Sequence, residues 1–217
     1  MNKYRGRRLF SVGMLSVALI GTASVGILTS YALFSDEAKS ANHVTAGTLE
    51  LEFKRTKLFG LFPNEQNGIL EQREDTTVVD LKTDNSDIIT ITNAVPGMSI
   101  TAEMELTNKG SVAFDTYVEI VDVTLGTGDI ATASLNLSQE LDIYLYTLNA
   151  NNEKVGSTFK LSEYNSENDR LAFALINKED SQKFYVEAKL DESVGNEVQN
   201  GQVSFDVHVT ATQKTSL

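Results

Sequence analysis

Apolar and polar residues alternate with a period of two along most of the chain after residue 48. This alternation puts apolar side chains on one face of a β-strand and polar side chains on the other. Strands with a single apolar face are typical of antiparallel sheets that pack on a shared core. The pattern therefore predicts an all-β fold, an antiparallel sandwich or barrel. The clearest alternating segments begin at Leu49, Ile100, Val118, Ile143, Phe184 and Val203.

Turn-forming residues separate these segments. Pro96-Gly97, Asn108-Lys109-Gly110 and Asn200-Gly201 all lie between predicted strands, where such residues favour chain reversal. The alternation shifts by one position at Ile120-Val121, which predicts a β-bulge or a doubly buried stretch. No linker or internal repeat divides the chain, so residues 46–217 are predicted to form one domain.

The rest of the chain is less regular. Short helices are predicted in loops over residues 134–141 and 166–178. An apolar patch begins at Leu58, and a polar run follows over residues 64–75 that is either a loop or a binding surface. Two further strands are predicted within residues 76–93.

The N-terminus has the three parts of a secretory signal. Residues 1–8 contain four basic residues and no acidic one, and Leu9 to Leu28 contains no charge. Ser30-Tyr31-Ala32 then puts small residues at the −3 and −1 positions of a peptidase site, so we expect a signal helix over residues 1–32 that is cleaved between Ala32 and Leu33. Three alternatives are an uncleaved anchor, a twin-arginine signal and a buried core helix.

Composition narrows the possible partners. The chain has 217 residues and a formal net charge of −12. This charge argues against nucleic acid and against an anionic membrane surface as partners, because both require basic patches. The chain contains no cysteine, which excludes disulfides, thiolate metal sites and a cysteine nucleophile. After cleavage, no second hydrophobic span or sorting motif is found to hold the chain in a membrane.

Candidate chemistry is sparse. The two histidines, His43 and His208, lie far apart and outside any His-Glu-x-x-His motif, so both are predicted to be surface residues. No Gly-x-Ser-x-Gly nucleophile elbow is found. Asp84-Asn85-Ser86-Asp87 is a candidate calcium loop, with a plain polar turn as the alternative. The sequence therefore predicts no catalytic residue, no metal site and no cofactor.

Several short motifs occur in an order that resembles one known family. Tyr31-Ala32-Leu33-Phe34-Ser35-Asp36 precedes a second stretch that runs from Thr45 to Leu51. Val95-Pro96-Gly97-Met98 and Leu106 to Ser111 follow, and Asn200 to Gln213 ends the series. The set resembles the TasA/camelysin family of exported bacterial surface and biofilm-matrix proteins. The motif positions are Gly47, Thr48, Leu49, Pro96, Gly97, Asn108, Gly110, Ser111 and Gly201.

The resemblance implies a jelly-roll sandwich and cleavage by a dedicated signal peptidase. It also implies donor-strand complementation, in which an N-terminal arm over residues 33–45 inserts into a groove of the next subunit. The apolar residues of that arm are Leu33, Phe34, Ala38, Ala41 and Val44. Some family members carry a metallopeptidase label, but no zinc motif is found in this chain.

Together these observations predict an exported structural subunit. It would assemble with copies of itself into fibres of a biofilm matrix, outside the cell or on its surface. Two alternatives are an accessory subunit that seeds or anchors the fibres of a related protein, and a secreted camelysin-type peptidase.

Overall fold

The computed structural model describes residues 35–37, 48–64, 69–81 and 88–213. The predicted signal helix and the Ala32–Leu33 cleavage bond lie outside these residues. So do His43 and the candidate calcium loop from Asp84 to Asp87. No helix among the described residues is long and apolar enough to span a membrane.

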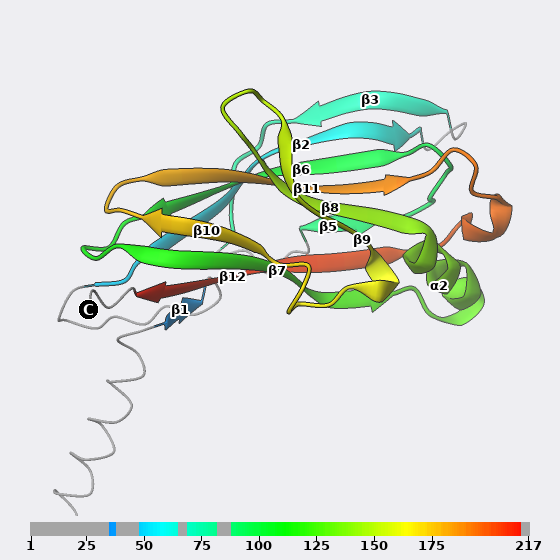
Figure 1. The fold of residues 1–217 in the computed structure, drawn as a ribbon. Coiled ribbons are helices and arrows are strands. Elements are labelled where there is room, and N and C mark those ends of the chain that lie inside the picture. Colours follow the sequence, from blue (N-terminus) through cyan, green and yellow to red (C-terminus); the bar gives the residue numbers. More distant parts are fainter. Residues whose placement is uncertain (1–34, 38–47, 65–68, 82–87, 214–217) are drawn as a thin grey trace, which may run out of the picture.

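Two antiparallel sheets pack face to face as a sandwich (Figure 1). In the first sheet the order is β1-β12-β7-β10, and β5 also pairs with β12. In the second the order is β3-β2-β6-β11-β8-β9, and β4 also pairs with β2. The strands are β1 (Ser35–Glu37), β2 (Leu51–Pro63), β3 (Leu70–Asp75), β4 (Val79–Asp80), β5 (Ile89–Ile91), β6 (Ser99–Asn108), β7 (Phe114–Leu125), β8 (Leu141–Leu148), β9 (Lys154–Lys160), β10 (Leu171–Ile176), β11 (Ser181–Leu190) and β12 (Val203–Gln213).

The strands from β5 to β12 form a complete jelly roll. One sheet contributes β5-β12-β7-β10 and the other β6-β11-β8-β9, the order produced by two interlocked Greek keys. This confirms the predicted all-β, jelly-roll-like antiparallel sandwich. The remaining strands are additions at one side: β2, β3 and β4 extend the second sheet beyond β6, and β1 joins β12 in the first.

The alternating apolar residues form the core. On β12 the buried residues Val203, Phe205, Val207, Val209 and Ala211 are the positions that the alternation predicts. The two sheets meet at aromatic side chains. The ring centroids of Phe184 on β11 and Phe173 on β10 lie 5.9 Å apart, and the Phe53 ring stacks on Phe184 at 6.0 Å.

The predicted bulge is confirmed. Ser204 pairs with Thr124 and Asp206 pairs with Val121, so β7 contains one more residue than β12 over this interval. Asp122, in the bulged stretch, has a φ of 51°. Short aspartate side chains tolerate this left-handed conformation better than most residues.

One of the two predicted helices is correct. The helix α2 (Ala131–Glu140) covers most of the predicted range 134–141. Residues 166–178 were predicted to be helical, and this is wrong because they contain β10. That strand pairs with β7, and its apolar residues Leu171 and Phe173 pack in the core, so tertiary pairing overrides the local pattern. Three short 3-10 turns complete the elements: η1 (Gly128–Ile130), η2 (Leu161–Glu163) and η3 (Asn196–Val198).

Residues 54–93 are more regular than their sequence indicates. Strand β2 continues through the apolar patch to Pro63, and β3 returns beside it as a hairpin. The polar run over residues 64–75 therefore includes an edge strand. Its exposed charged residues suit that place, because charged edges resist pairing with other chains.

Candidate functional site

The N-terminal arm reaches the sandwich as an added strand. Strand β1 pairs antiparallel with the C-terminal part of β12, as Figure 1 shows. Asp36 lies opposite Ala211, between the pairs Ser35 with Thr212 and Glu37 with Thr210. The predicted arm residues Leu33, Phe34, Ala38, Ala41 and Val44, and the motif residue Gly47, lie outside the described residues.

Two short strands pair with the same edge of β12. Strand β5 pairs with Val203 to Phe205, and β1 pairs with Thr210 to Thr212. No described strand pairs with β12 residues 206–209 on this edge, although β7 pairs with them on the other.

The motif residues hold the chain where it enters the sandwich. The Thr48 amide donates to the Ser111 hydroxyl at 2.9 Å, and the Ser111 amide donates back to the Thr48 carbonyl at 2.7 Å. The amides of Lys109 and Gly110 both donate to the Glu50 carbonyl, at 2.8 and 3.1 Å. We call this group, with Asn108, the arm anchor.

Asn108 is the centre of the arm anchor and is fully buried. Its side-chain amide donates to the carbonyls of Val112 and Ile176, at 2.8 and 3.0 Å. Its side-chain oxygen accepts the Gly110 amide at 2.9 Å. Because Asn108 ends β6 in one sheet and Ile176 ends β10 in the other, this side chain links the two sheets.

Only glycine fits at position 110, because a side chain there would collide with the backbone. A Cβ atom at this position would lie 2.1 Å from the Thr48 carbonyl oxygen and 2.7 Å from the Glu50 nitrogen. Both are backbone atoms that are already held by hydrogen bonds, so they have little room to move. The neighbouring motif residue Leu49 packs against the hydrophobic core.

The other motif residues lie at the opposite end of the sandwich. The ten residues of β6 separate the arm anchor from the Pro96-Gly97 turn by about 30 Å. Gly97 has a φ of 80°, and the Met98 amide donates to the Val95 carbonyl at 3.2 Å, as in a type II turn with proline second and glycine third. Gly201 lies against α2, where a Cβ atom would approach the Ala133 carbonyl to 2.6 Å.

A groove of about 530 Å³ opens at this opposite end. Its wall comes from β5 and the turn that follows it, together with the end of β2. The groove lies at the side of the sandwich where β5 covers β12 for only three residues. Residues that line it include Phe62, Pro63, Thr90, Asn93, Met98 and Asn200.

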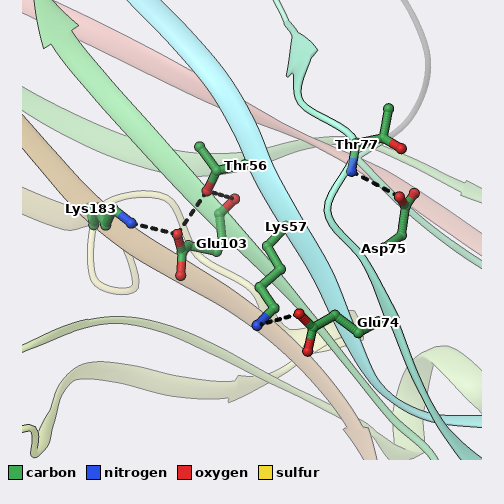
Figure 2. Close-up of polar contacts among 7 residues, drawn as sticks. All are labelled: Thr56, Lys57, Glu74, Asp75, Thr77, Glu103 and Lys183. Carbon is green, nitrogen blue, oxygen red and sulfur yellow. Dashed lines mark hydrogen bonds and ion pairs between the residues drawn. The ribbon is translucent and has the colours of Figure 1, made fainter.

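The outer face of the second sheet carries paired charges rather than an isolated acid–base group. Figure 2 shows Glu103 accepting hydrogen bonds from Lys183 at 2.7 Å and from the Thr56 hydroxyl at 2.9 Å. Thr56 is the extra residue of a second bulge, between Arg55 and Lys57. The Lys57–Glu74 ion pair at 2.9 Å continues the series toward β3, beyond which the Thr77 amide donates to Asp75 (Figure 2).

This pairing predicts a pH dependence of stability. Partial burial alone would raise the pKa of Glu103, but the hydrogen bonds from Lys183 and Thr56 outweigh it and hold the pKa below its ordinary value. A carboxyl group whose pKa is lower in the folded state than in the unfolded chain stabilises the fold at pH values above its unfolded pKa. This stabilisation is lost as the pH falls through the pKa of the folded state. At pH 7, the free energy of unfolding of Glu103→Gln should therefore be about 1 kcal/mol lower than that of the wild type, as measured by urea denaturation.

At pH 3 the difference between the wild type and Glu103→Gln should shrink toward zero. Lys183→Met provides the matched partner for a double-mutant cycle, whose coupling energy should fall in the same way. An equal difference at both pH values would show that the charge on Glu103 contributes nothing.

The described residues contain no group of three or more histidine, cysteine, aspartate or glutamate side chains that would hold a metal ion. His208 was predicted to be a surface residue, and its side chain is 18% exposed. Its Nδ1 lies 3.2 Å from a Glu119 oxygen. The two residues form a cross-strand pair on the outer face of the first sheet.

The structure shows two features, at Tyr164 and at Arg55, that the sequence did not indicate. The Tyr164 hydroxyl accepts the Ile120 amide at 3.0 Å, beyond the point where β10 stops pairing with β7. Burial raises the pKa of Tyr164 to about 12. Arg55 lies opposite Met104, whose side chain is fully buried, and the buried Nε of Arg55 has no hydrogen-bond partner among the described residues.

No model of a known protein family matches the chain, and no curated protein matches it. Three features of the structure itself therefore bear on the function of the chain. They are an added strand on the β12 edge, a buried anchor at the base of the arm, and a groove at the opposite end.

Proposed function

We propose that the chain is an exported structural subunit that assembles into fibres of a biofilm matrix by donor-strand complementation. In this mechanism residues 1–32 are removed, and the arm that begins at Leu33 pairs with the sheet edge of a neighbouring subunit. The motif resemblance to the TasA/camelysin family supports the export step and the class of assembly.

One observation carries the proposal. Strand β1 adds to the edge of a jelly roll whose eight strands, β5 to β12, are complete without it. A strand that the sandwich does not need can be exchanged between subunits without unfolding either one. An added edge strand gains backbone hydrogen bonds wherever an edge accepts it.

The arm anchor suits this role because it separates the arm from the sandwich. Among the described residues, Thr48 and Glu50 make backbone hydrogen bonds with the β6–β7 turn. They hold the base of the arm whichever edge the arm occupies. Addition of an arm to the next copy is a head-to-tail contact, which produces filaments where it does not close into a ring.

Negative-stain microscopy of the chain from Leu33 onward tests the proposal. This chain contains every residue that the structure describes. We expect fibres from it and single particles from a variant that lacks residues 33–44. A control that replaces residues 33–44 with glycine and serine of equal length should also give single particles, because spacing alone does not supply a donor strand.

Single particles from all three samples would contradict self-assembly. A change in the number or length of fibres formed by a related protein, when the chain is added at low ratio, would then favour an accessory subunit. Fibres from the variant without residues 33–44 would show that assembly does not use the arm.

A further inference from the structure

Strand β10 is an outer strand of the first sheet. It pairs with β7 on one side, and no described strand pairs with it on the other. Its residues, Leu171–Ile176, include no charged residue, no proline and no glycine. Leu175 on this strand is 44% exposed. An uncharged apolar edge of this kind is prone to pair with a further strand.

Charges protect the outer strands of the second sheet. Four of the six residues of β3 are charged. If β9 paired antiparallel with β9 of a second copy about its central residue, Lys154 would lie opposite Lys160 of that copy. Like charges that lie directly opposite each other destabilise a strand pair. Strand β10 carries no such protection along its length.

A bulge makes β10 complementary to itself. Between the pairs Phe173 with Thr116 and Ile176 with Phe114, β10 has two residues where β7 has one. The extra residue shifts the alternation of faces. Leu171 and Ile176 are therefore both buried in the core, although a regular strand would place residues five positions apart on opposite faces. Bulges often twist an edge away from a partner, but this one matches the faces of two antiparallel copies.

We propose that β10 pairs antiparallel with β10 of a second copy, about a two-fold axis perpendicular to the first sheet. Pairing about the centre of the strand places Leu171 opposite Ile176 of the second copy, and Ala172 opposite Leu175. Opposite residues in paired strands face the same side. Core-facing residues then lie opposite core-facing residues, and the exposed Ala172 lies opposite the exposed Leu175. The first sheets of the two copies join into one continuous sheet.

The charges that flank β10 are complementary in this register. It places Asp169 opposite Lys178 of the second copy, and the two-fold axis repeats this pair at the other end of the contact. A shift of one residue in one direction would place Arg170 opposite Lys178, two like charges. A shift in the other direction would place Asp169 opposite Asn177 and lose both ion pairs. The flanking charges therefore select the register that also matches the faces.

The surface beside Ala172 has room for the side chain that would lie opposite it. A hollow of about 460 Å³ is lined by residues that include Tyr117, Arg170, Ala172 and Leu175. The Arg170 guanidinium lies over the Tyr117 ring, 4.8 Å from its centroid. In the dimer, Leu175 of the second copy packs beside Ala172 against this hollow. An exposed apolar side chain of each copy is then removed from water, which favours association.

This contact goes beyond the proposed function. Strands β10 and β1 lie at opposite ends of the strand order of the first sheet. Pairing through β10 therefore leaves the β12 edge that pairs with β1 unchanged. Fibres that form through the arm would be joined side by side in pairs.

Introduced cysteines test the register, because the chain contains no cysteine of its own. Facing residues in antiparallel strands have Cα distances of about 4.5–5.5 Å, within the disulfide range. We expect disulfide-linked dimers on a denaturing gel when Ala172→Cys and Leu175→Cys variants of the chain from Leu33 are mixed and oxidised. Val155→Cys, at a 51% exposed position on the outer strand β9, is the matched control and should give no dimer with either variant.

Sedimentation equilibrium of the soluble fraction tests the strength of the contact. The parent chain is expected to form dimers. Ala172→Lys puts a charge on the edge of β10 opposite Leu175, so the dissociation constant of the dimer should rise at least about tenfold. Thr158→Lys adds the same charge at an exposed position of β9 and should leave the dissociation constant unchanged. Both variants should keep the melting temperature of the parent chain, because both positions are exposed.

Three results would each overturn the β10 dimer. They are a soluble fraction that stays monomeric at every concentration, a dissociation constant that does not change in Ala172→Lys, and no disulfide between Ala172→Cys and Leu175→Cys. The microscopy of fibres tests the proposed function separately. Fibres without the β10 link would overturn this contact and leave the proposed function standing. Dimers linked through β10 in a chain that forms no fibres would do the reverse.

Discussion

Replacement of Asn108 with alanine is expected to lower the free energy of unfolding by about 4 kcal/mol. The substitution removes the two side-chain donors to Val112 and Ile176 and the acceptor of the Gly110 amide. Because Asn108 is fully buried, the carbonyls of Val112 and Ile176 lose this donor where water has little access, and the Gly110 amide keeps only its contact with the Glu50 carbonyl. Each unsatisfied buried group costs about 1–3 kcal/mol. Urea denaturation of the chain from Leu33 measures the change.

Asn149→Ala is the matched control for this prediction. Asn149 also accepts backbone amides, those of Asn151 and Glu153, but it lies in an exposed turn. Water replaces the lost contacts there, so the expected cost is about 1 kcal/mol or less. Equal losses for the two variants would contradict the central role given to Asn108 in the arm anchor.

Replacement of Phe184 with alanine is expected to cost about 3–5 kcal/mol of unfolding free energy. Its side chain is fully buried and contacts the rings of Phe53 and Phe173. The cavity left by alanine would open between the two sheets, whose paired strands restrict collapse. Thermal and urea unfolding should both report the loss.

Phe59→Ala provides the comparison. Phe59 is partly exposed on the outer face of the second sheet, where Lys57 lies over its ring at 5.0 Å from the centroid. Its truncation leaves no internal cavity, so we expect a loss of about 1 kcal/mol or less. A loss at Phe184 no larger than that at Phe59 would show that the sheets do not depend on this aromatic contact.

The arm anchor has a consequence for assembly as well as for stability. A chain with a weakened anchor, such as Asn108→Ala, would no longer hold the arm at a defined place near Thr48. The length of arm that reaches a neighbour would then vary. Fibres of that variant are expected to be fewer or less regular than those of the parent chain, in the same microscopy assay.

The amino-acid sequence by itself determined the class of the fold and most of its strands. Period-two alternation marked the buried residues of β6, β11 and β12, because only one face of each of these strands meets the core. The shift at Ile120-Val121 predicted a bulge that the pairing of β7 with β12 confirms. Lack of cysteine and scarcity of histidine limited the kinds of catalytic and metal-binding chemistry that the chain can support.

Only the tertiary structure decided how distant segments combine. Residues 166–178 lacked a clear alternation, and pairing with β7 makes part of them a strand. The polar run 64–75 became the edge strand β3 because β2 offers it a partner, and hydrogen bonding along an edge does not require apolar side chains. Thr48 and Ser111 are 63 residues apart and meet only through the β6–β7 turn. Which edge the arm takes depends on long-range pairing with β12, and no local pattern in the sequence carries that information.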